Sequence, residues 1–399
     1  MKVVIVNCFD TYEDRVLLLQ RYFLNRGDAV RVVTSDYRHF KKEYRTEKPE
    51  GFIFVHAKKY EKNLSPERMI SHDRFAKDAF KKIEKLRPTL IWVLAPPNSL
   101  VKRAAQYREA HRNTRLIVDM IDMWPETMPV GSLKLLPPFQ MWKSLRDRYI
   151  NKADIIVTEC ELYKKALSHK CDKEKMRTLY LAKMGELSDT SKVQDMSHSR
   201  SDSEEAETGK CIEKYKVGRN TPPTDRWELC YLGSINNIID IDLIGDIIKA
   251  LPERAEKPLI HVIGDGEQKD ALLNTCKEAG AEVTYHGKVY DRQEKQRIFD
   301  TCHYGLNIMK PGVFVGLTMK SLDYFAGGLP IINNIAGDTK LFVEKRNIGI
   351  NFQKGMTLTE ADLSGNAEKR ANVNKLFEDK FTESSFDRKL DKIMGLIER

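Results

Sequence analysis

Short apolar segments alternate with longer segments of mixed polarity along the chain. Six apolar segments in the first half predict strands, at Val3–Asn7, Ala29–Thr34, Gly51–His56, Leu90–Leu94, Leu116–Asp119 and Asp154–Thr158. Six more in the second half do the same, at Glu228–Leu232, Leu259–Ile263, Glu282–Tyr285, Tyr304–Ile308, Ile331–Ile332 and Ile348–Asn351. Helical spacing between strands, as in Tyr12–Asn25 and Asp73–Leu86, completes the pattern. It predicts an α/β protein with two doubly wound, Rossmann-like domains.

A polar stretch separates the two halves. Residues 185–225 are rich in Ser, Asp, Glu, Lys and Thr without apolar periodicity, which predicts a flexible insertion. We therefore expect an N-terminal domain over residues 1–184 and a C-terminal domain over residues 226–384. Apolar residues at helical spacing predict a final helix over residues 385–399. Because ligands of open parallel sheets bind beyond the strand ends, we expect a substrate cleft between the domains.

Residues 313–338 contain a Gly-bearing loop, a short helix and a buried strand. Gly316 allows a ligand to approach the backbone closely, and Thr318 is suited to cap the helix. Lys320 falls in the first turn, where free N–H groups and the helix dipole favour an anion. Asp323 lies on the same face and offers a carboxylate to hydroxyl donors such as a ribose. These features predict a phosphate site, and the alternative is an ordinary helix with a solvated Lys–Asp pair.

The same stretch resembles the nucleotide-sugar site of GT-B glycosyltransferases of the retaining family 4 type, in their bacterial polysaccharide-assembly branch. Members of that branch carry a recurring Lys, acidic residue and Tyr, and Lys320, Asp323 and Tyr324 occupy those places. Two positions depart from the family pattern. Asp323 stands where Glu is usual, and Val315 stands where many members have a second Glu that helps to hold the sugar.

The resemblance also implies that the final helix, over residues 385–399, crosses back to the N-terminal domain. Further motifs in the second half extend the resemblance. Gly233-Ser234 follows a predicted strand and could present N–H groups and a hydroxyl to a diphosphate. The Gly264-Asp265-Gly266 turn is typical of these proteins, and the alternative is that it simply closes a β–α connection. Tyr285–Val289 corresponds to the segment that frames the nucleotide base. The donor-binding residues implied by these motifs and the resemblance are Gly233, Ser234, Gly264, Lys288, Val289, Gly316, Leu317, Thr318, Lys320 and Asp323. Of these, Lys320 is also assigned a catalytic role.

The first half contains an Asp-x-x-Asp-x-Trp-Pro-Glu sequence that begins at Asp119. It resembles a sequence found in family members that act on lipid-linked acceptors. The resemblance implies an acceptor side formed by Asp119, Trp124 and Glu126, with Asp122 as a catalytic candidate. In this interpretation Asp122 or Glu126 hydrogen-bonds an acceptor hydroxyl. In the alternative, Asp122 caps the next turn and Trp124 packs in the domain interface.

Other chemistries lack the residues that they need. The seven cysteines are scattered without a CxxC pair, and the chain contains no HExxH, GxSxG or Walker sequence. Asp240 and Asp242 have the spacing of a metal-binding pair, but carboxylates there more simply stabilise a helix N-terminus. The first strand is not followed by a Gly-rich loop, which argues against a dinucleotide. We therefore expect no cofactor and no essential metal.

The net charge of +9 is concentrated in two segments. Lys102–Arg115 is rich in basic residues, and Lys134–Arg146 mixes aromatic, aliphatic and cationic side chains. Peripheral contact with anionic lipid is one interpretation, and a merely solvated basic face is an equal alternative. No nucleic-acid motif accompanies the charge, so nucleic acid is not an expected partner. No apolar run is long enough to span a bilayer and no signal peptide is recognisable, so we expect a cytoplasmic location, including the inner face of the membrane.

Together these observations predict a metal-independent, hexosyltransferase-like glycosyltransferase. It would move a sugar from a nucleotide diphosphate, with UDP the favoured carrier, to a glycan or lipid-linked acceptor. Retention of the anomeric configuration is implied by the resemblance alone. Lys320 and the Gly233-Ser234 turn would stabilise charge on the departing diphosphate, while Asp323 anchors the ribose. The alternatives are a non-catalytic GT-B accessory subunit, which Val315 favours, and a nucleotide-sugar epimerase, which shares the architecture.

Overall fold

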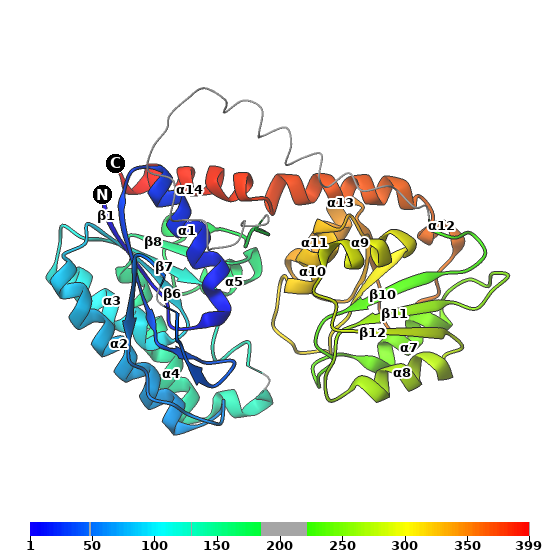
Figure 1. Cartoon of the computed structure of the whole chain (residues 1–399), viewed down its shortest axis with the longest axis horizontal. Helices are drawn as coiled ribbons and strands as arrows, with labels where there is room; N and C mark the ends of the chain where they lie inside the picture. Colours follow the sequence, from blue (N-terminus) through cyan, green and yellow to red (C-terminus); the bar gives the residue numbers. More distant parts are fainter. Residues whose placement is uncertain (48, 129, 185–221, 399) are drawn as a thin grey trace. The chain divides into compact units, whose positions relative to one another are not determined.

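The computed structural model describes residues 1–47, 49–128, 130–184 and 222–398. The chain divides into two compact units (Figure 1). Unit 1 comprises Met1–Lys183, Gly312–Leu317 and Glu378–Arg399, and unit 2 comprises Met184–Pro311 and Thr318–Phe377. Most of the predicted insertion, residues 185–221, lies outside the described residues.

Unit 1 is built on a parallel sheet of seven strands in the order β5-β2-β1-β6-β7-β8-β9 (Figure 1). The strands are β1 Lys2–Val6, β2 Ala29–Ser35, β5 Phe52–Val55, β6 Leu90–Ala95, β7 Arg115–Met120, β8 Ile155–Thr158 and β9 Met176–Thr178. A hairpin, β3 Tyr37–Arg38 and β4 Glu43–Tyr44, lies outside this sheet. Every residue of β6 is buried, because helices cover both faces of the sheet.

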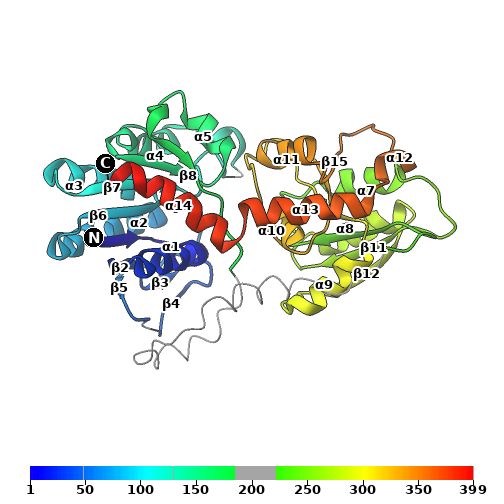
Figure 2. The ribbon, with the colours of Figure 1, turned by 90° about the horizontal axis from the view of Figure 1, so that it is seen from above.

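The helices of unit 1 pack on both faces of its sheet. They are α1 Glu13–Asn25, α2 Pro66–Leu86, α3 Asn98–Ala110, α4 Pro137–Asp147, α5 Glu161–Leu167 and α14 Glu383–Ile397, with short 3-10 helices η1 Asp10–Tyr12, η2 Gly131–Leu135, η3 Ile150–Lys152 and η4 Lys173–Lys175. Figures 1 and 2 show α14, the predicted C-terminal helix, beside α1. Tyr22 of α1 donates its hydroxyl to Asp391 of α14 at 2.7 Å, and Arg21 pairs with Asp387 at 2.8 Å.

Unit 2 repeats this architecture with six parallel strands in the order β12-β11-β10-β13-β14-β15. The strands are β10 Glu228–Leu232, β11 Leu259–Ile263, β12 Glu282–Gly287, β13 Tyr304–Asn307, β14 Ile331–Asn333 and β15 Gly349–Asn351. Its helices are α7 Ile241–Lys249, α8 Lys269–Glu278, α9 Arg292–Thr301, α10 Met319–Ala326, α11 Asp338–Arg346, α12 Glu360–Leu363 and α13 Asn366–Lys380. In Figure 1, α7 and α8 lie below this sheet and α9, α10 and α11 above it.

The predicted fold class is confirmed by these two doubly wound units. Every predicted strand is present, because alternating apolar segments mark buried parallel strands well. The second predicted helix begins earlier than expected, at Pro66, where the Ser65 hydroxyl accepts the Arg68 N–H group and caps the helix. Within the described ranges, no helix combines the length and the apolar character that crossing a bilayer requires.

Candidate functional site

The strand order of unit 2 reverses between β10 and β13, and ligands of open parallel sheets bind beyond the strand ends at such a reversal. β10 continues into Gly233, and β13 continues into Ile308. Lys320 lies at this point. Its Nζ donates to the Ile308 carbonyl at 3.1 Å, and its Cδ is 4.0 Å from where a Gly233 Cβ would be. The structure therefore brings Gly233 and Lys320, both predicted from sequence, together at the switch point.

Helix α10 begins where the sequence predicted. The Thr318 side chain accepts the Ser321 N–H group at 3.1 Å, which confirms Thr318 as the N-cap. Lys320 is the second residue of the helix, so its side chain starts among the free N–H groups of the first turn. The helix dipole and these N–H groups both favour an anion there.

Lys320 is a buried lysine with few polar partners among the described residues. It is 8% exposed, and its only hydrogen bond in the described part of the chain goes to the Ile308 carbonyl. No carboxylate among the described residues pairs with it. Its Nζ lies 5.2 Å from the centre of the Tyr231 ring. Burial lowers the pKa of Lys320 to about 7, because the charged form has lost its water. An anion arriving at the switch point would stabilise the charged form.

Asp323 lies one turn after Lys320 on α10. It is half-buried, and its Oδ1 is 3.9 Å from Nζ of Lys295 on α9. At that distance Lys295 and Asp323 form a loose ion pair. The predicted ribose contact stays a prediction.

Tyr324 holds α10 against the centre of the sheet. Its hydroxyl accepts the Leu232 N–H group at 2.8 Å and donates to the Cys230 carbonyl at 3.1 Å, both on β10. The ring fits because β13 carries Gly305, where a Cβ would lie 2.7 Å from it. Tyr324 thus fixes the helix that carries Lys320 relative to the strand that leads to Gly233.

An asparagine ladder, which the sequence analysis missed, supports the start of α10. Register pairing aligns Asn307, Asn333 and Asn351 at the ends of β13, β14 and β15. Asn307 donates to Asn333 at 2.8 Å, and Asn333 donates to Asn351 at 2.8 Å. Asn307 also accepts the Ser321 hydroxyl at 3.2 Å. The available signal was an Asn at the end of three successive strands.

The predicted use of the Gly233 N–H group needs a correction, whereas the donor-binding roles of Ser234 and Gly264 stay predictions. The Gly233 N–H group donates to Ile263 at 2.9 Å, and the Gly264 N–H group donates to Gly287 at 2.7 Å, so neither is free for a diphosphate. A Cβ on Gly264 would lie 1.9 Å from the Gly233 carbonyl oxygen, and φ at Gly264 is +141°. Gly264 therefore lets two strand ends meet, as in the alternative stated above, and Gly233 provides room beside Lys320. Ser234 is exposed next to them.

The remaining donor-side candidates lie at the ends of their predicted elements. Lys288 follows β12 and is 58% exposed, with Nζ 3.7 Å from Asp265, while Val289 is buried. Gly316 and Leu317 group with unit 1, whereas Thr318 begins the adjoining segment of unit 2. The donor-binding roles of Lys288, Val289, Gly316 and Leu317 stay predictions.

Asp119 was predicted at an acceptor side, and this prediction is wrong. The residue is fully buried at 0% exposure. Its carboxylate accepts two hydrogen bonds of 2.8 Å from Arg15 and one of 2.8 Å from the Trp92 indole. Arg15 is itself 1% exposed. Asp119 is therefore half of a core ion pair that joins α1 to β7, and it presents no oxygen to an acceptor.

Asp122 and Trp124 contact each other. Asp122 accepts the Trp124 indole N–H at 2.7 Å and the Met123 N–H group at 2.8 Å. Its carboxylate thus stabilises the turn after β7, as the alternative proposed. Burial raises the pKa of Asp122. The Trp124 ring packs under the Arg68 guanidinium at 4.3 Å and against Trp142. Catalysis by Asp122 stays a prediction.

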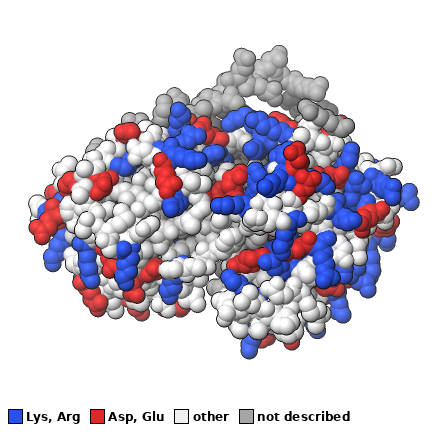
Figure 3. All heavy atoms as spheres, turned by 180° about the vertical axis from the view of Figure 1, so that it is seen from behind, with Lys and Arg blue, Asp and Glu red and all other residues white. Residues whose placement is uncertain are grey.

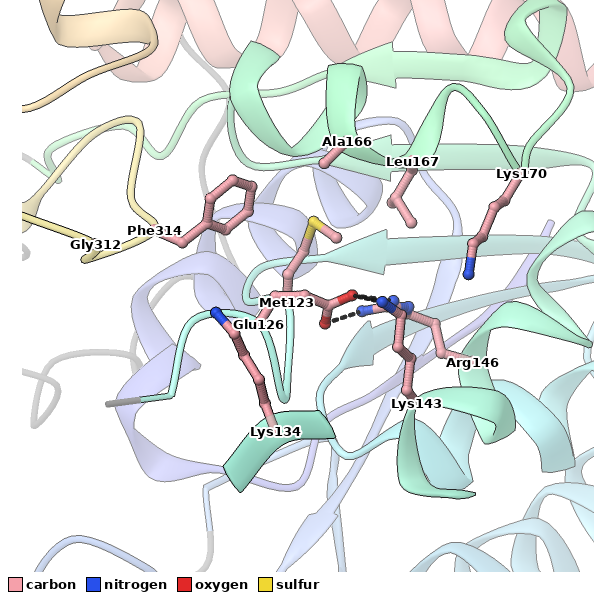
Figure 4. Close-up of a pocket in the computed structure, with 10 residues that line it drawn as sticks. All are labelled: Met123, Glu126, Lys134, Lys143, Arg146, Ala166, Leu167, Lys170, Gly312 and Phe314. Atoms are coloured by element: carbon pink, nitrogen blue, oxygen red, sulfur yellow. Dashed lines mark hydrogen bonds and ion pairs between the residues drawn. The ribbon is translucent and has the colours of Figure 1, made fainter. Parts of the chain in front are cut away.

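Glu126 lies on the wall of a pocket in unit 1 (Figure 4). It accepts hydrogen bonds of 3.0 and 2.7 Å from Arg146, and Lys143 lies 2.9 Å away. Burial alone would raise the pKa of Glu126, but these two cations lower it to about 2. Glu126 is therefore an ionised acceptor of hydrogen bonds over the whole physiological range.

Both basic segments contain paired cations, and they differ in the apolar side chains that they expose. In Lys102–Arg115, Arg108 and Arg115 both pair with Asp154, at 2.9 and 3.1 Å. The other segment, Lys134–Arg146, follows Leu133 and exposes apolar side chains beside its cations. Figure 3 shows Lys and Arg in patches with Asp and Glu between them. Only the second segment therefore keeps the mixed apolar and cationic surface that lipid contact needs.

The carboxylates with metal-like spacing have another role. Asp240 accepts the Leu243 N–H group at 3.1 Å and caps α7, as the helix-stabilising interpretation predicted. Among the residues that the structure describes, no group of three or more His, Cys, Asp or Glu is placed to hold a metal ion.

Comparison with solved structures identifies the architecture as the GT-B fold. The chain is similar to Anabaena HepE in complex with UDP, at 12% identity and a TM-score of 0.63 over 99% of this chain and 100% of that one. The chain is also similar to sucrose-phosphate synthase from Thermosynechococcus elongatus, at 12% identity and a TM-score of 0.66 over 100% of this chain and 99% of that one. A third similar structure is WaaG, a glycosyltransferase involved in lipopolysaccharide biosynthesis. Its identity is 12% and its TM-score 0.60, over 98% of this chain and 100% of that one. At the sequence level, no family model and no curated protein matches the chain.

Proposed function

We propose that the chain is a glycosyltransferase that moves a sugar from a nucleotide diphosphate to a glycan or lipid-linked acceptor. The observation that carries this proposal is the Lys320 ammonium, which is buried at the switch point of unit 2 and has no carboxylate partner in the described part of the chain. A diphosphate is the ligand class that such a cation at a helix N-terminus suits best. UDP is the favoured carrier, which the fold-level likeness to HepE, solved with UDP and with UDP-glucose, supports.

In the proposed reaction, Lys320 acts on the leaving group. The bond between the anomeric carbon and the β-phosphate oxygen breaks, and negative charge grows on the diphosphate. Lys320 and the first turn of α10 stabilise that charge from fixed positions, so they need no rearrangement during the reaction. With retention, the acceptor oxygen bonds to the anomeric carbon on the face that the phosphate leaves. The departing phosphate takes the acceptor proton.

One sequence feature favours a second candidate, a non-catalytic GT-B subunit that binds a nucleotide sugar or a partner enzyme. Val315 stands where the resembled family usually has a carboxylate for the donor sugar. An enzyme would slowly hydrolyse its nucleotide sugar even without an acceptor, and a silent subunit would not. Product analysis would also reveal an epimerase, because the sugar would change while the nucleotide stayed attached.

Calorimetric titration of UDP, GDP and ADP tests the donor assignment. We expect UDP to bind selectively and Asp323→Ala to weaken that binding by roughly 10- to 100-fold, the usual effect of losing a hydrogen bond to a charged group. Asp270→Ala is the matched control, because Asp270 on α8 is an 86% exposed carboxylate of the same unit. Failure of all three nucleotides to bind would contradict the proposal and leave a partner-binding subunit as the better explanation.

Donor binding should take up a proton above neutral pH. Burial lowers the pKa of Lys320 to about 7, so most molecules carry a neutral amine at pH 8. A bound diphosphate favours the ammonium and raises this pKa, so binding at pH 8 should take up close to one proton, and binding at pH 6 almost none. UDP itself contributes little to the proton uptake at pH 8, since a terminal phosphate has a pKa of about 6 and is already ionised.

The measurement is calorimetry at pH 8 in two buffers with different ionisation enthalpies. Lys320→Arg provides the control, because its guanidinium keeps a positive charge and is already protonated before UDP binds. The proton uptake on binding should therefore disappear in this variant. Equal apparent enthalpies in both buffers for the wild-type protein would show that Lys320 does not meet the diphosphate.

A further inference from the structure

A pocket of about 350 Å³ in unit 1 is lined by four cations, Lys134, Lys143, Arg146 and Lys170. Lys134 belongs to η2, Lys143 and Arg146 belong to α4, and Lys170 follows α5. Figure 4 shows the Lys134 and Lys170 ammonium groups directed into the pocket from opposite sides of the Glu126–Arg146 pair. Its volume is at the lower end of the range for small-molecule sites, about 300–1,000 Å³.

The cations of this pocket outnumber the carboxylates. Glu126 pairs with Arg146 and Lys143, and Asp147 pairs with Arg146 and Lys170. Four cations against two carboxylates leave a local charge of +2. Within the described residues Lys134 has no carboxylate partner. Lys134 can therefore meet an anion without first breaking an ion pair, and Lys170 can reach it from its exposed pair with Asp147.

Apolar surface adjoins the cations. Met123, Leu167 and Phe314 line the pocket itself. Large apolar side chains are exposed along η2, α4 and the residue between them. They are Leu133 at 52%, Leu135 at 71%, Leu136 at 48% and Met141 at 70%. The chemistry that fits is a phosphate attached to a larger, partly apolar molecule.

We propose that this pocket binds a phosphate or diphosphate group carried by the acceptor. Lys134 and Lys170 are the specificity-determining residues, because both reach the pocket and neither is needed to neutralise Glu126. Arg146 and Lys143 hold Glu126 in place. The assignment of the ligand as an acceptor rests on the proposed function, but anion binding by the pocket does not. Two sources share this chemistry, a soluble phosphorylated glycan and a lipid-linked one.

The test compares the full-length chain with Lys134→Gln/Lys170→Gln. Sodium pyrophosphate is titrated at constant ionic strength, with and without UDP, so that any second site at Lys320 is filled. We expect the double substitution to weaken pyrophosphate binding at least about tenfold, given the usual contributions of two lysines near a phosphate surface. Lys82→Gln on α2, an exposed lysine of the same unit, is the matched control and should have no effect.

A second arm separates the two sources. Flotation is measured with phosphatidylcholine vesicles that contain or lack phosphatidic acid. If the acceptor is lipid-linked, phosphatidic acid vesicles bind the wild-type chain, and Leu135→Ser/Met141→Ser abolishes that binding. If the acceptor is soluble, pyrophosphate binds and vesicles do not. Either result supports the pocket.

Pyrophosphate binding of equal strength in Lys134→Gln/Lys170→Gln and Lys82→Gln would overturn the proposal, as would no binding of either probe. The double variant should keep its wild-type melting temperature, because Lys170 is 49% exposed and Arg146 still pairs with Asp147. The pocket proposal and the proposed function can also be refuted independently of each other. Loss of UDP binding in the wild-type chain would remove the glycosyltransferase proposal, yet lysine-dependent pyrophosphate binding would still establish the anion pocket.

Discussion

Replacing Lys320 with Met should lower glycosyl transfer by about 10²–10³-fold while the protein stays folded. The magnitude is that of removing one fixed group that stabilises transition-state charge. Met fills a similar volume without charge, and the lost hydrogen bond is the single one to the Ile308 carbonyl. The measurement is release of nucleotide from the UDP-sugar that binds, together with the melting temperature.

A matched control is available in the same unit. Lys369 is also buried, at 7% exposure, but its Nζ donates to the Asp362 and Ser364 carbonyls near α12. Lys369→Met should therefore change stability and leave turnover unaffected. Wild-type turnover in Lys320→Met would remove Lys320 from the mechanism.

The Lys320→Met protein should also differ from wild type in how its stability depends on pH. In the folded state the pKa of Lys320 is about 7, below its unfolded value near 10.5. Between these values the unfolded chain binds more protons, so wild-type stability rises as the pH increases from about 7. Each unit of pKa lowering corresponds to about 1.4 kcal/mol. The variant lacks this pH dependence. Its gain in stability over the wild type should therefore be greatest below pH 7.

Replacing Asp119 with Asn should destabilise the protein by about 3–5 kcal/mol, the usual result of breaking a buried ion pair. Arg15 would keep its charge at 1% exposure, but an Asn has only one oxygen to accept the two hydrogen bonds that Arg15 donates to Asp119. The Trp92 indole would compete for that same oxygen. Denaturant unfolding of the two proteins measures the difference. The acceptor KM of the folded variant should not change, because Asp119 does not reach the surface.

A double variant separates the ion pair from other effects of the substitution. Arg15→Met/Asp119→Leu removes both charges and should recover much of the lost stability, although the Leu179 carbonyl also loses its bond from Arg15. An Asn variant as stable as the wild type, but with a raised acceptor KM, would instead restore Asp119 to the acceptor side.

Local sequence predicted the parts of the fold and site that depend on neighbouring residues. The strands were predictable because buried parallel strands are short apolar segments, and α10 was predictable because Thr318 caps it and Gly327 ends it. The start of α2 at Pro66 was missed, although Ser65 and Pro66 are ordinary N-terminal signals. Lys320 was predicted to be an anion ligand from its place in the first turn, and this role stays a prediction.

The tertiary structure decided which side chains meet and which are free. The DxxDxWPE sequence could not reveal that Asp119 pairs with Arg15, 104 residues away, because a strand covered on both faces shows no polar side. Local sequence also could not show that Gly233 and Gly264 use their N–H groups in hydrogen bonds between strands, or that three asparagines align. By itself, then, the sequence determined the elements and predicted a type of chemistry, since caps, turns and periodicity are local. Strand register and burial, which join distant segments, decided the counter-ions, the free donors and the pocket.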